Sequence, residues 1–228
     1  MKRFYKNVQV GDGFRVLLDG RAVRTPGKAE LLIPWRPLAE AVAAEWAGQT
    51  EVVRPQGMPL MRLCTSVIDL FPGRMDDARG EIVEFGAHDL LCYRAEEPSE
   101  LRMRQDRCWQ PWVDWSADVL RAPLTVTTGI SPVDQPESTL TRFENLVRGV
   151  DSWSLMGLHA AVKLTGSMVL GLALQRGELD PQAAFAATLL DELFEIERWG
   201  LEKEQAGRHA GLRLELEAVA AFCRLVSD

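Results

Sequence analysis

The longest apolar tract of this chain, residues 155–174, constrains the fold more than any other feature, because its apolar surface has to be buried. Four polar side chains interrupt the tract: His159, Lys163, Thr165 and Ser167. They exclude a membrane-spanning helix, which needs about 20 predominantly apolar residues in a row. Small residues recur four positions apart, in the pairs Gly157 with Ala161 and Ser167 with Gly171. Such pairs let another helix approach closely, so we predict that residues 153–175 lie at the centre of a helical domain.

The first part of the chain has the pattern of a small antiparallel sheet. Residues 8–10 and 14–18 are predicted to be strands joined by a glycine-containing turn at 11–13. The Asp-Gly pair at 19–20 is a second hairpin signal, and residues 21–24 follow it as a third strand.

Helical spacing begins after the sheet, where two prolines flank the start of a predicted helix over residues 38–46. Trp46 continues the apolar side of this helix, and we expect it to fasten the helix to the sheet. Residues 51–53 resemble another short strand. The sequence thus predicts a small N-terminal α+β domain over residues 1–72.

Helical patterns dominate the remainder. Pro111 is predicted to divide the segment 99–120 into a kinked helix or a pair of helices, and residues 125–135 are predicted to be extended or a loop. The last helix has a core-facing stripe at spacings of four and three, made by Leu212, Leu216, Val219, Cys223 and Val226. The predicted fold class is α+β, in which a larger all-α helical domain over residues 73–228 follows the small N-terminal domain.

Charge is distributed unevenly along the chain. The formal net charge is −7, which argues against a nucleic-acid-binding protein. Residues 1–36 contain eight Lys and Arg against three Asp and Glu, a charge of +5, so the remainder carries −12. This asymmetry predicts two domains with different surfaces.

The cysteines and the N-terminus indicate a cytoplasmic protein. The four cysteines lie far apart with no CxxC pair, as reduced thiols do. The segment after Met1 lacks the apolar run of a signal peptide. We expect no membrane insertion.

Motifs for catalysis are absent from the sequence. It has no phosphate-binding glycine loop, no dinucleotide fingerprint, no HExxH and no GxSxG, so we expect no catalytic residues, cofactor, metal or small-molecule substrate. His88 and Cys92 are four apart, the spacing of a thiolate–imidazolium pair on a helix, which leaves a hydrolase or thiol enzyme as an alternative. The apolar run around Cys92 favours a packed thiol instead. Asp76, Asp77 and Glu81 fit the acidic first turn of a helix better than a cation site.

An acidic helical segment is the strongest candidate for a binding site. Wound at about 100° per residue, one arc of it collects Asp191, Glu192, Glu195, Trp199 and Glu202. The opposite arc is apolar and accounts for folding. Carboxylates around an exposed tryptophan repel one another, so the acidic arc is either a partner-binding face or a solvated surface with an incidental tryptophan. Gly200 can end the helix and move Glu202 off that face.

Six short segments in order give the chain a family resemblance. They are LDGR at 18–21 with TP at 25–26, AEW at 44–46 with Gln49, MPL at 58–60, DLLCYR at 89–94, GS at 166–167, and DE at 191–192 with WG at 199–200. With these segments the chain resembles bacterial members of the F1-ATPase assembly-chaperone family that handles the α subunit, the Atp-twelve family.

The resemblance implies an N-terminal α+β domain, a C-terminal helical domain, and binding of the unassembled α subunit of F1-ATPase without nucleotide or metal chemistry. It also implies that the acidic segment around Asp191 takes part in partner binding. Glu195 departs from the family, which commonly has glutamine there. A scaffold within the assembled synthase is a further alternative; it would co-purify with the intact complex, whereas a chaperone would be found with the free α subunit.

Overall fold

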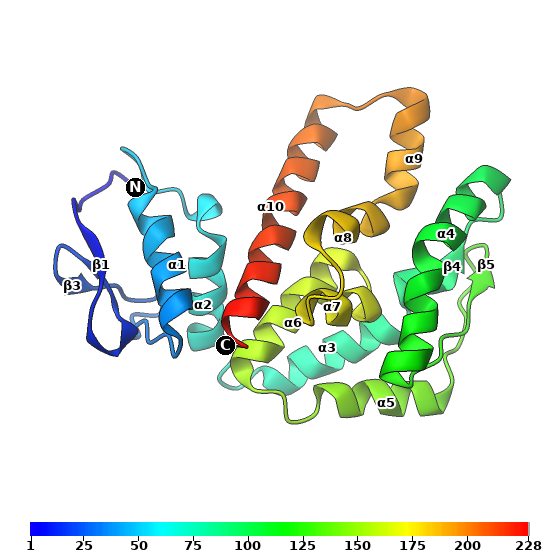
Figure 1. Ribbon diagram of the computed structural model, residues 1–228, viewed down its shortest axis with the longest axis horizontal. Coiled ribbons are helices and arrows are strands. Elements are labelled where there is room, and N and C mark those ends of the chain that lie inside the picture. The colour runs from blue at the N-terminus through cyan, green and yellow to red at the C-terminus, as the bar shows by residue number, and fades with distance from the viewer. Residues whose placement is uncertain (228) are drawn as a thin grey trace.

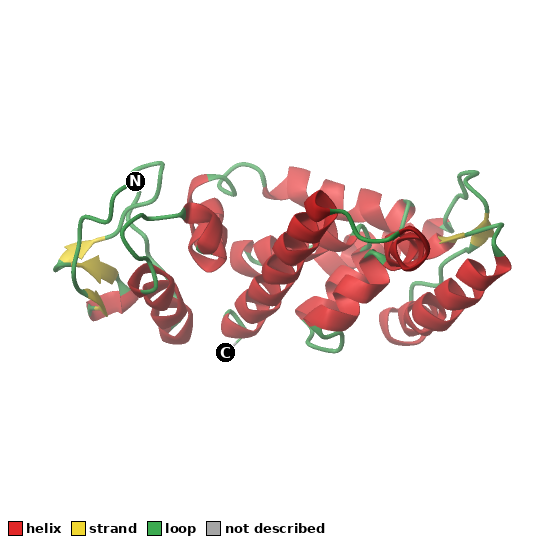
Figure 2. Cartoon of the chain, turned by 90° about the horizontal axis from the view of Figure 1, so that it is seen from above, coloured by secondary structure: helices red, strands yellow, loops and turns green. Residues whose placement is uncertain are grey.

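The structure, a computed structural model, describes residues 1–227. Figure 1 shows an elongated molecule with a small sheet and two helices at one end and a body of helices that extends to the other. From above, strands lie at both ends, the N-terminal sheet at one and a two-stranded pair at the other (Figure 2). The predicted α+β class is confirmed.

The N-terminal sheet is a three-stranded antiparallel meander. Its strands are β1 (Val8–Val10), β2 (Val16–Leu18) and β3 (Arg21–Ala22), in the order β1-β2-β3. The Asp19–Gly20 turn has positive φ at both residues, 48° and 80°, as a two-residue hairpin requires. The expected strand at 51–53 is only an isolated bridge between Lys2 and Val52.

Helix α1 (Arg36–Ala47) packs on this sheet, and α2 (Pro59–Asp69) packs on α1; each begins with proline in its first turn. The Glu45 carboxylate joins them by accepting from the backbone N–H groups of Leu60 and Met61, at 2.8 Å each. Burial raises the pKa of Glu45 although these bonds oppose the shift. The carboxylate therefore caps the N-terminus of α2 from the neighbouring helix.

The helical body follows α2. Its elements are α3 (Met75–Ala87), β4 (Tyr93–Arg94), α4 (Ser99–Trp115), the π-helical turn Ser116–Leu120, β5 (Thr127–Thr128), α5 (Glu137–Val147), α6 (Ser152–Thr165), α7 (Met168–Gln175), α8 (Pro181–Thr188), α9 (Leu190–Trp199) and α10 (Lys203–Leu225). Strands β4 and β5 pair in parallel, the latter within the predicted loop 125–135. The acidic first turn predicted at Asp76 and Asp77 begins α3.

The structure adds detail to two sequence-based expectations for this body, and at Pro111 it excludes the predicted pair of helices. The apolar tract 153–175 is two helices, because Gly166 adopts a left-handed conformation (φ 66°) and the Ser167 side chain caps α7. Helix α4 continues through Pro111, which lies on its exposed side, where water can bind the carbonyl left without a donor. The irregularity occurs later, in the π-helical turn.

The buried apolar residues form one cluster that extends from Tyr5 to Val226. Both α6 and α7 lie within it, as predicted, and so does the stripe of α10, of which Leu212 is half-buried. Helix α2 packs against α6 and α10, which makes it the link between the two ends. None of the helices within residues 1–227 has both the length and the apolar composition needed to cross a bilayer.

Candidate functional site

The acidic segment forms a corner between two helices. Helix α9 ends at Trp199, and Gly200 (φ 90°, ψ 163°) turns the chain into α10. Glu202 is therefore not on α9. It is the N-cap of α10, in a capping box in which its side chain accepts from the backbone N–H of Gln205 while the Gln205 side chain binds the Glu202 N–H.

The turn still brings three of the predicted residues together. A shallow hollow of about 340 Å³ is lined by Glu195, Ile196, Trp199, Gly200, Leu201, Glu202 and Gln205, which we call the acidic corner. The Trp199 side chain is 82% exposed, the highest value for any tryptophan here. Glu195 and Glu202 are exposed, and neither forms an ion pair with residues 1–227.

The side chains of the other two predicted residues, exposed Asp191 and half-buried Glu192, bind residues of neighbouring helices. The Asp191 carboxylate accepts from Nε2 of buried Gln105 at 2.8 Å, which ties α9 to α4. Glu192 accepts from His209 Nε2 at 2.9 Å and from Arg208, both on α10. Although burial raises the pKa of Glu192, these two partners outweigh it and hold the pKa below its usual value.

Helix α4 makes two further ion pairs with α9. Arg104 of α4 pairs with Glu197 at 2.7 Å, and Arg198 pairs with Glu100 at 3.0 Å. The guanidinium of Arg198 lies 4.1 Å from the centre of the buried Phe194 ring. Helix α9 lies between α4 and α10 (Figure 1). It presents Glu195 and Trp199, and the start of α10 presents Glu202. An exposed aromatic ring between carboxylates that form no ion pair within residues 1–227 suits a partner surface that is both apolar and basic.

The alternative thiol site is not assembled. Cys92 is fully buried, and burial raises the pKa of its thiol to about 12. Its sulfur lies 3.5 Å from the amide nitrogen of Gln135, which is no base. His88 follows the last residue of α3. Glu81, which the sequence offered as part of a cation site, has its carboxylate 2.8 Å from His159 Nε2 instead. Within residues 1–227 no three His, Cys, Asp or Glu side chains gather as a metal site would require.

Sequence reasoning missed the residues that support the corner. Gln105, Arg208 and His209 lie on α4 and α10, and nothing in the helical pattern of 190–199 indicates which distant side chains meet it. The sequence did contain one usable signal, the Glu202 and Gln205 spacing of a capping box after Gly200.

Comparisons with known proteins agree on one family. The model of the family described as ATP12 chaperone protein matches residues 2–117. The protein named atp12, mitochondrial, from Schizosaccharomyces pombe is 25% identical over 244 residues, spanning all of this chain and 84% of that protein.

Solved structures show the same fold. The crystal structure of Atp12 from Paracoccus denitrificans has a TM-score of 0.89 and 38% identity, and the match covers 98% of this chain and 97% of that one. The Atu1473 protein of Agrobacterium tumefaciens has a TM-score of 0.93 and 37% identity, over 99% of this chain and 86% of that chain.

Proposed function

Because this chain belongs to the ATP12 chaperone protein family, we propose that it is an assembly chaperone of F1-type ATP synthase, which binds the unassembled α subunit and prevents its aggregation. One observation carries the proposal for a site: the acidic corner exposes Trp199 between two carboxylates that form no ion pair within residues 1–227, Glu195 on α9 and Glu202 at the start of α10. We propose further that the protein acts without catalysis, nucleotide or metal, and in the cytoplasm.

Such a chaperone has to cover the exposed apolar surface of the α subunit reversibly. An isolated α subunit exposes apolar surface that it later buries against its neighbours, and exposed apolar patches promote aggregation. A ring that is 82% exposed supplies apolar contact area, while the carboxylates add specificity and association rate without irreversible burial. The partner surface that fits is apolar with arginine or lysine at its edge.

The five predicted partner-binding residues divide into two roles in this proposal. Glu195, Trp199 and Glu202 contact the α subunit. Asp191 and Glu192 hold α9 against α4 and α10, so they orient the contacting residues. Substitutions in the two groups should therefore differ, since only the second group should lower the melting temperature.

The test measures suppression of α-subunit aggregation by light scattering, with thermal melting in parallel. Trp199→Ala should weaken binding by about 2 kcal/mol, and Glu195→Lys should abolish protection at low salt by reversing the charge that faces the partner. Both side chains are exposed, so the free energy of unfolding should stay within about 0.5 kcal/mol of the wild-type value. Glu202→Gln is preferable to a lysine there, because its oxygen still caps α10.

A matched control is Glu217→Lys, which makes the same charge change at another exposed, unpaired glutamate of α10. It should protect the α subunit like the wild type. Equal protection by Glu195→Lys and Trp199→Ala would show that the corner is only a solvated surface. Stoichiometric recovery with the finished synthase, instead of with the free α subunit, would favour a scaffold.

A further inference from the structure

Helix α4 has one polar residue in its buried face. That face consists of four residues spaced four apart, namely Leu101, Gln105, Trp109 and Val113. Gln105 is 1% exposed, although an apolar side chain at this position would be buried without needing any hydrogen-bond partner. A buried amide is stabilising only where its polar atoms are bonded, so the partners of Gln105 explain why a glutamine is there.

Both polar atoms of the Gln105 amide are hydrogen-bonded. Its oxygen accepts from the backbone N–H of Ala95 at 2.6 Å, and its nitrogen donates to the Asp191 carboxylate at 2.8 Å. A backbone N–H can only donate and a carboxylate accepts, so these two partners fix which way the amide faces. Ala95 follows β4, and its carbonyl accepts from Arg102 of α4 at 2.9 Å. Gln105 thus joins the end of β4 to α9 through the buried face of α4.

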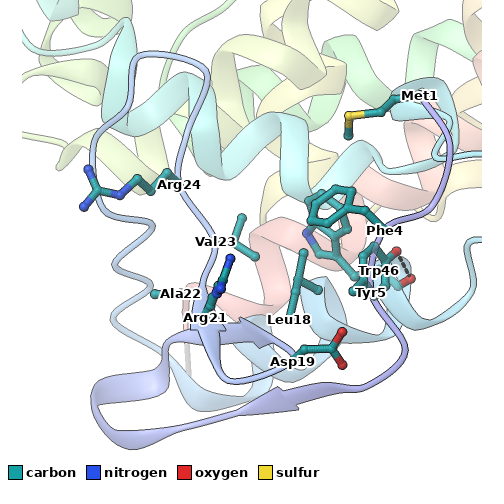
Figure 3. A pocket seen from close by; sticks show the side chains of 10 residues that line it. All are labelled: Met1, Phe4, Tyr5, Leu18, Asp19, Arg21, Ala22, Val23, Arg24 and Trp46. Carbon is teal, nitrogen blue, oxygen red and sulfur yellow. Dashed lines mark hydrogen bonds between the residues drawn. The ribbon is translucent and has the colours of Figure 1, made fainter.

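Burial does not by itself ensure hydrogen bonding in this protein. Trp46, which lines the hollow between the N-terminal sheet and α1, has a buried indole N–H without a partner within residues 1–227 (Figure 3). The two hydrogen bonds of Gln105 are therefore a particular feature of its position in α4.

Asp191 lies on the same side of α9 as the exposed residues of the acidic corner. It precedes Glu195 by four positions, and Glu195 precedes Trp199 by four, so the three side chains share one face. Helix α9 has ten residues and is about 15 Å long. A rotation or tilt of α9 at Asp191 therefore changes the direction in which both Glu195 and Trp199 point.

The ion pairs between α4 and α9 are more exposed than this hydrogen bond. In the pairs Arg104–Glu197 and Arg198–Glu100, the side chains are 37–58% exposed, so water and salt compete with them. The Gln105 amide is shielded from water. Its bond to Asp191 is therefore the polar contact with α4 that is best suited to fix the direction of α9.

We infer that Gln105 is a positioning residue of the acidic corner: its hydrogen bond to Asp191 sets the direction of α9, and Asp191 is needed as the acceptor of this bond and not as a charge that meets the partner. The inference rests on the proposed function, because it assigns how the proposed site is held in place. It adds a residue of α4 that lies outside the acidic corner.

Two substitutions of Asp191 separate the acceptor from the charge. Asp191→Asn removes the charge but keeps an oxygen that accepts from Gln105, whereas Asp191→Leu removes both. The measurement is the chaperone concentration that suppresses half of the α-subunit aggregation. It should stay within about twofold of the wild-type value for Asp191→Asn and rise at least about tenfold for Asp191→Leu.

Gln105→Met keeps the length and the burial of the side chain and removes both hydrogen bonds. In hydrogen exchange of the whole chain, its effect on rates should be at least about tenfold larger for the amides of α9 than for those of α6. Protection of the α subunit should weaken as it does in Asp191→Leu. The double variant Gln105→Met with Asp191→Leu should be no worse than either single variant, because both changes remove the same bond.

Gln110→Met is the matched control. Gln110 also donates to an aspartate at 2.8 Å, but this partner is Asp114 of the same helix, and both side chains are exposed. The control should exchange and protect the α subunit like the wild type.

Wild-type exchange of α9 in Gln105→Met would overturn the inference. Equal loss of protection in Asp191→Asn and Asp191→Leu would overturn it too, because Asp191 would then act through its charge. Normal protection by Gln105→Met, in an assay where Trp199→Ala loses protection, would refute the role of Gln105 and leave the proposed function standing. Full protection by Trp199→Ala would instead contradict the proposed function, and the inference with it.

Discussion

Three tryptophans illustrate how differently one residue type is used in this fold. Trp109 is buried with its indole N–H bonded to the Ala187 carbonyl, and it contributes only to the core. Trp199 is 82% exposed at the acidic corner, and Trp46 is buried with an indole N–H that has no hydrogen-bond partner within residues 1–227. Buried tryptophans normally have their donor satisfied, as Trp109 does, so Trp46 is the exception among these three.

Asp89 gives a prediction for pH dependence. It is fully buried, and burial raises its pKa from 3.8 to about 6, even though the backbone N–H groups of Leu91 and Val169 donate to it. Between about pH 4 and pH 6 the folded protein holds a proton that the unfolded chain has released, so this group makes stability fall as pH rises through that window. The full effect is up to about 3 kcal/mol.

The measurement is the free energy of unfolding in urea at about pH 4 and pH 7. Asp89→Asn cannot titrate, so relative to the wild type it should gain up to about 3 kcal/mol between these two pH values, whatever its absolute stability. Asp180→Asn, at another aspartate that caps a helix, is the control for the chemical change from carboxylate to amide. Identical pH curves for Asp89→Asn and the wild type would mean that Asp89 is ionised throughout.

At the scale of residues, the sequence predicted which side chains are exposed better than which side chains contact one another. Helical periodicity was enough to predict that Glu195 and Trp199 lie outward, because each position follows from its neighbours. It did not reveal that Glu192 meets His209, or that Asp191 meets Gln105, since both partners come from other helices. The hollow beside Trp46 depends on the sheet and α1 together, and no local pattern encodes it.

At the scale of elements, the apolar tract packs against itself. The small residues four apart were predicted to admit a second helix, and for Gly171 that helix is α6, the first half of the same tract. Hydrophobic periodicity continues across the break at Gly166 and Ser167, so pattern alone favoured one helix. The left-handed glycine and the serine cap decided the outcome.

Gly171→Ala tests that packing. An added Cβ would lie 2.5 Å from Cγ2 of Val162 and 3.0 Å from its backbone nitrogen, so α6 and α7 would have to separate. We expect a loss of about 1–3 kcal/mol in the free energy of unfolding, measured in urea. Gly207→Ala is the matched control, since its Cβ meets nothing within 4 Å in α10, and it should stabilise by about 0.5–1 kcal/mol. A neutral Gly171→Ala would show that the α6–α7 contact is looser than described.

At the scale of the whole molecule, the two ends of the chain differ in charge. Residues 1–36 carry +5, and the acidic corner belongs to the remainder, which carries −12. The asymmetry was visible in the sequence. The sequence did not show which of these charges remain unpaired at the surface, because that depends on the fold.

We propose that residues 1–72 and 73–228 are two lobes of one cooperative unit. The predicted boundary lies in the turn between α2 and α3, but α2 packs against α6 and α10, and Arg62 of α2 pairs with Glu215 of α10. The buried cluster continues through this contact. Neither lobe has a separate core, so the whole chain should unfold in one transition.

Trp46→Arg tests whether the two lobes unfold together. The ring is 9% exposed and packs on Tyr5, so an arginine there would bury a charge without a partner and cost about 3 kcal/mol or more, on the order of 10 °C in melting temperature. Because the core is continuous, calorimetry should show one transition moved downward, with fluorescence and circular dichroism coinciding. Trp46→Phe, which remains apolar, should shift the same transition much less. A new low-temperature transition in Trp46→Arg, with the rest of the protein melting as in the wild type, would mean that residues 1–72 fold as an independent domain.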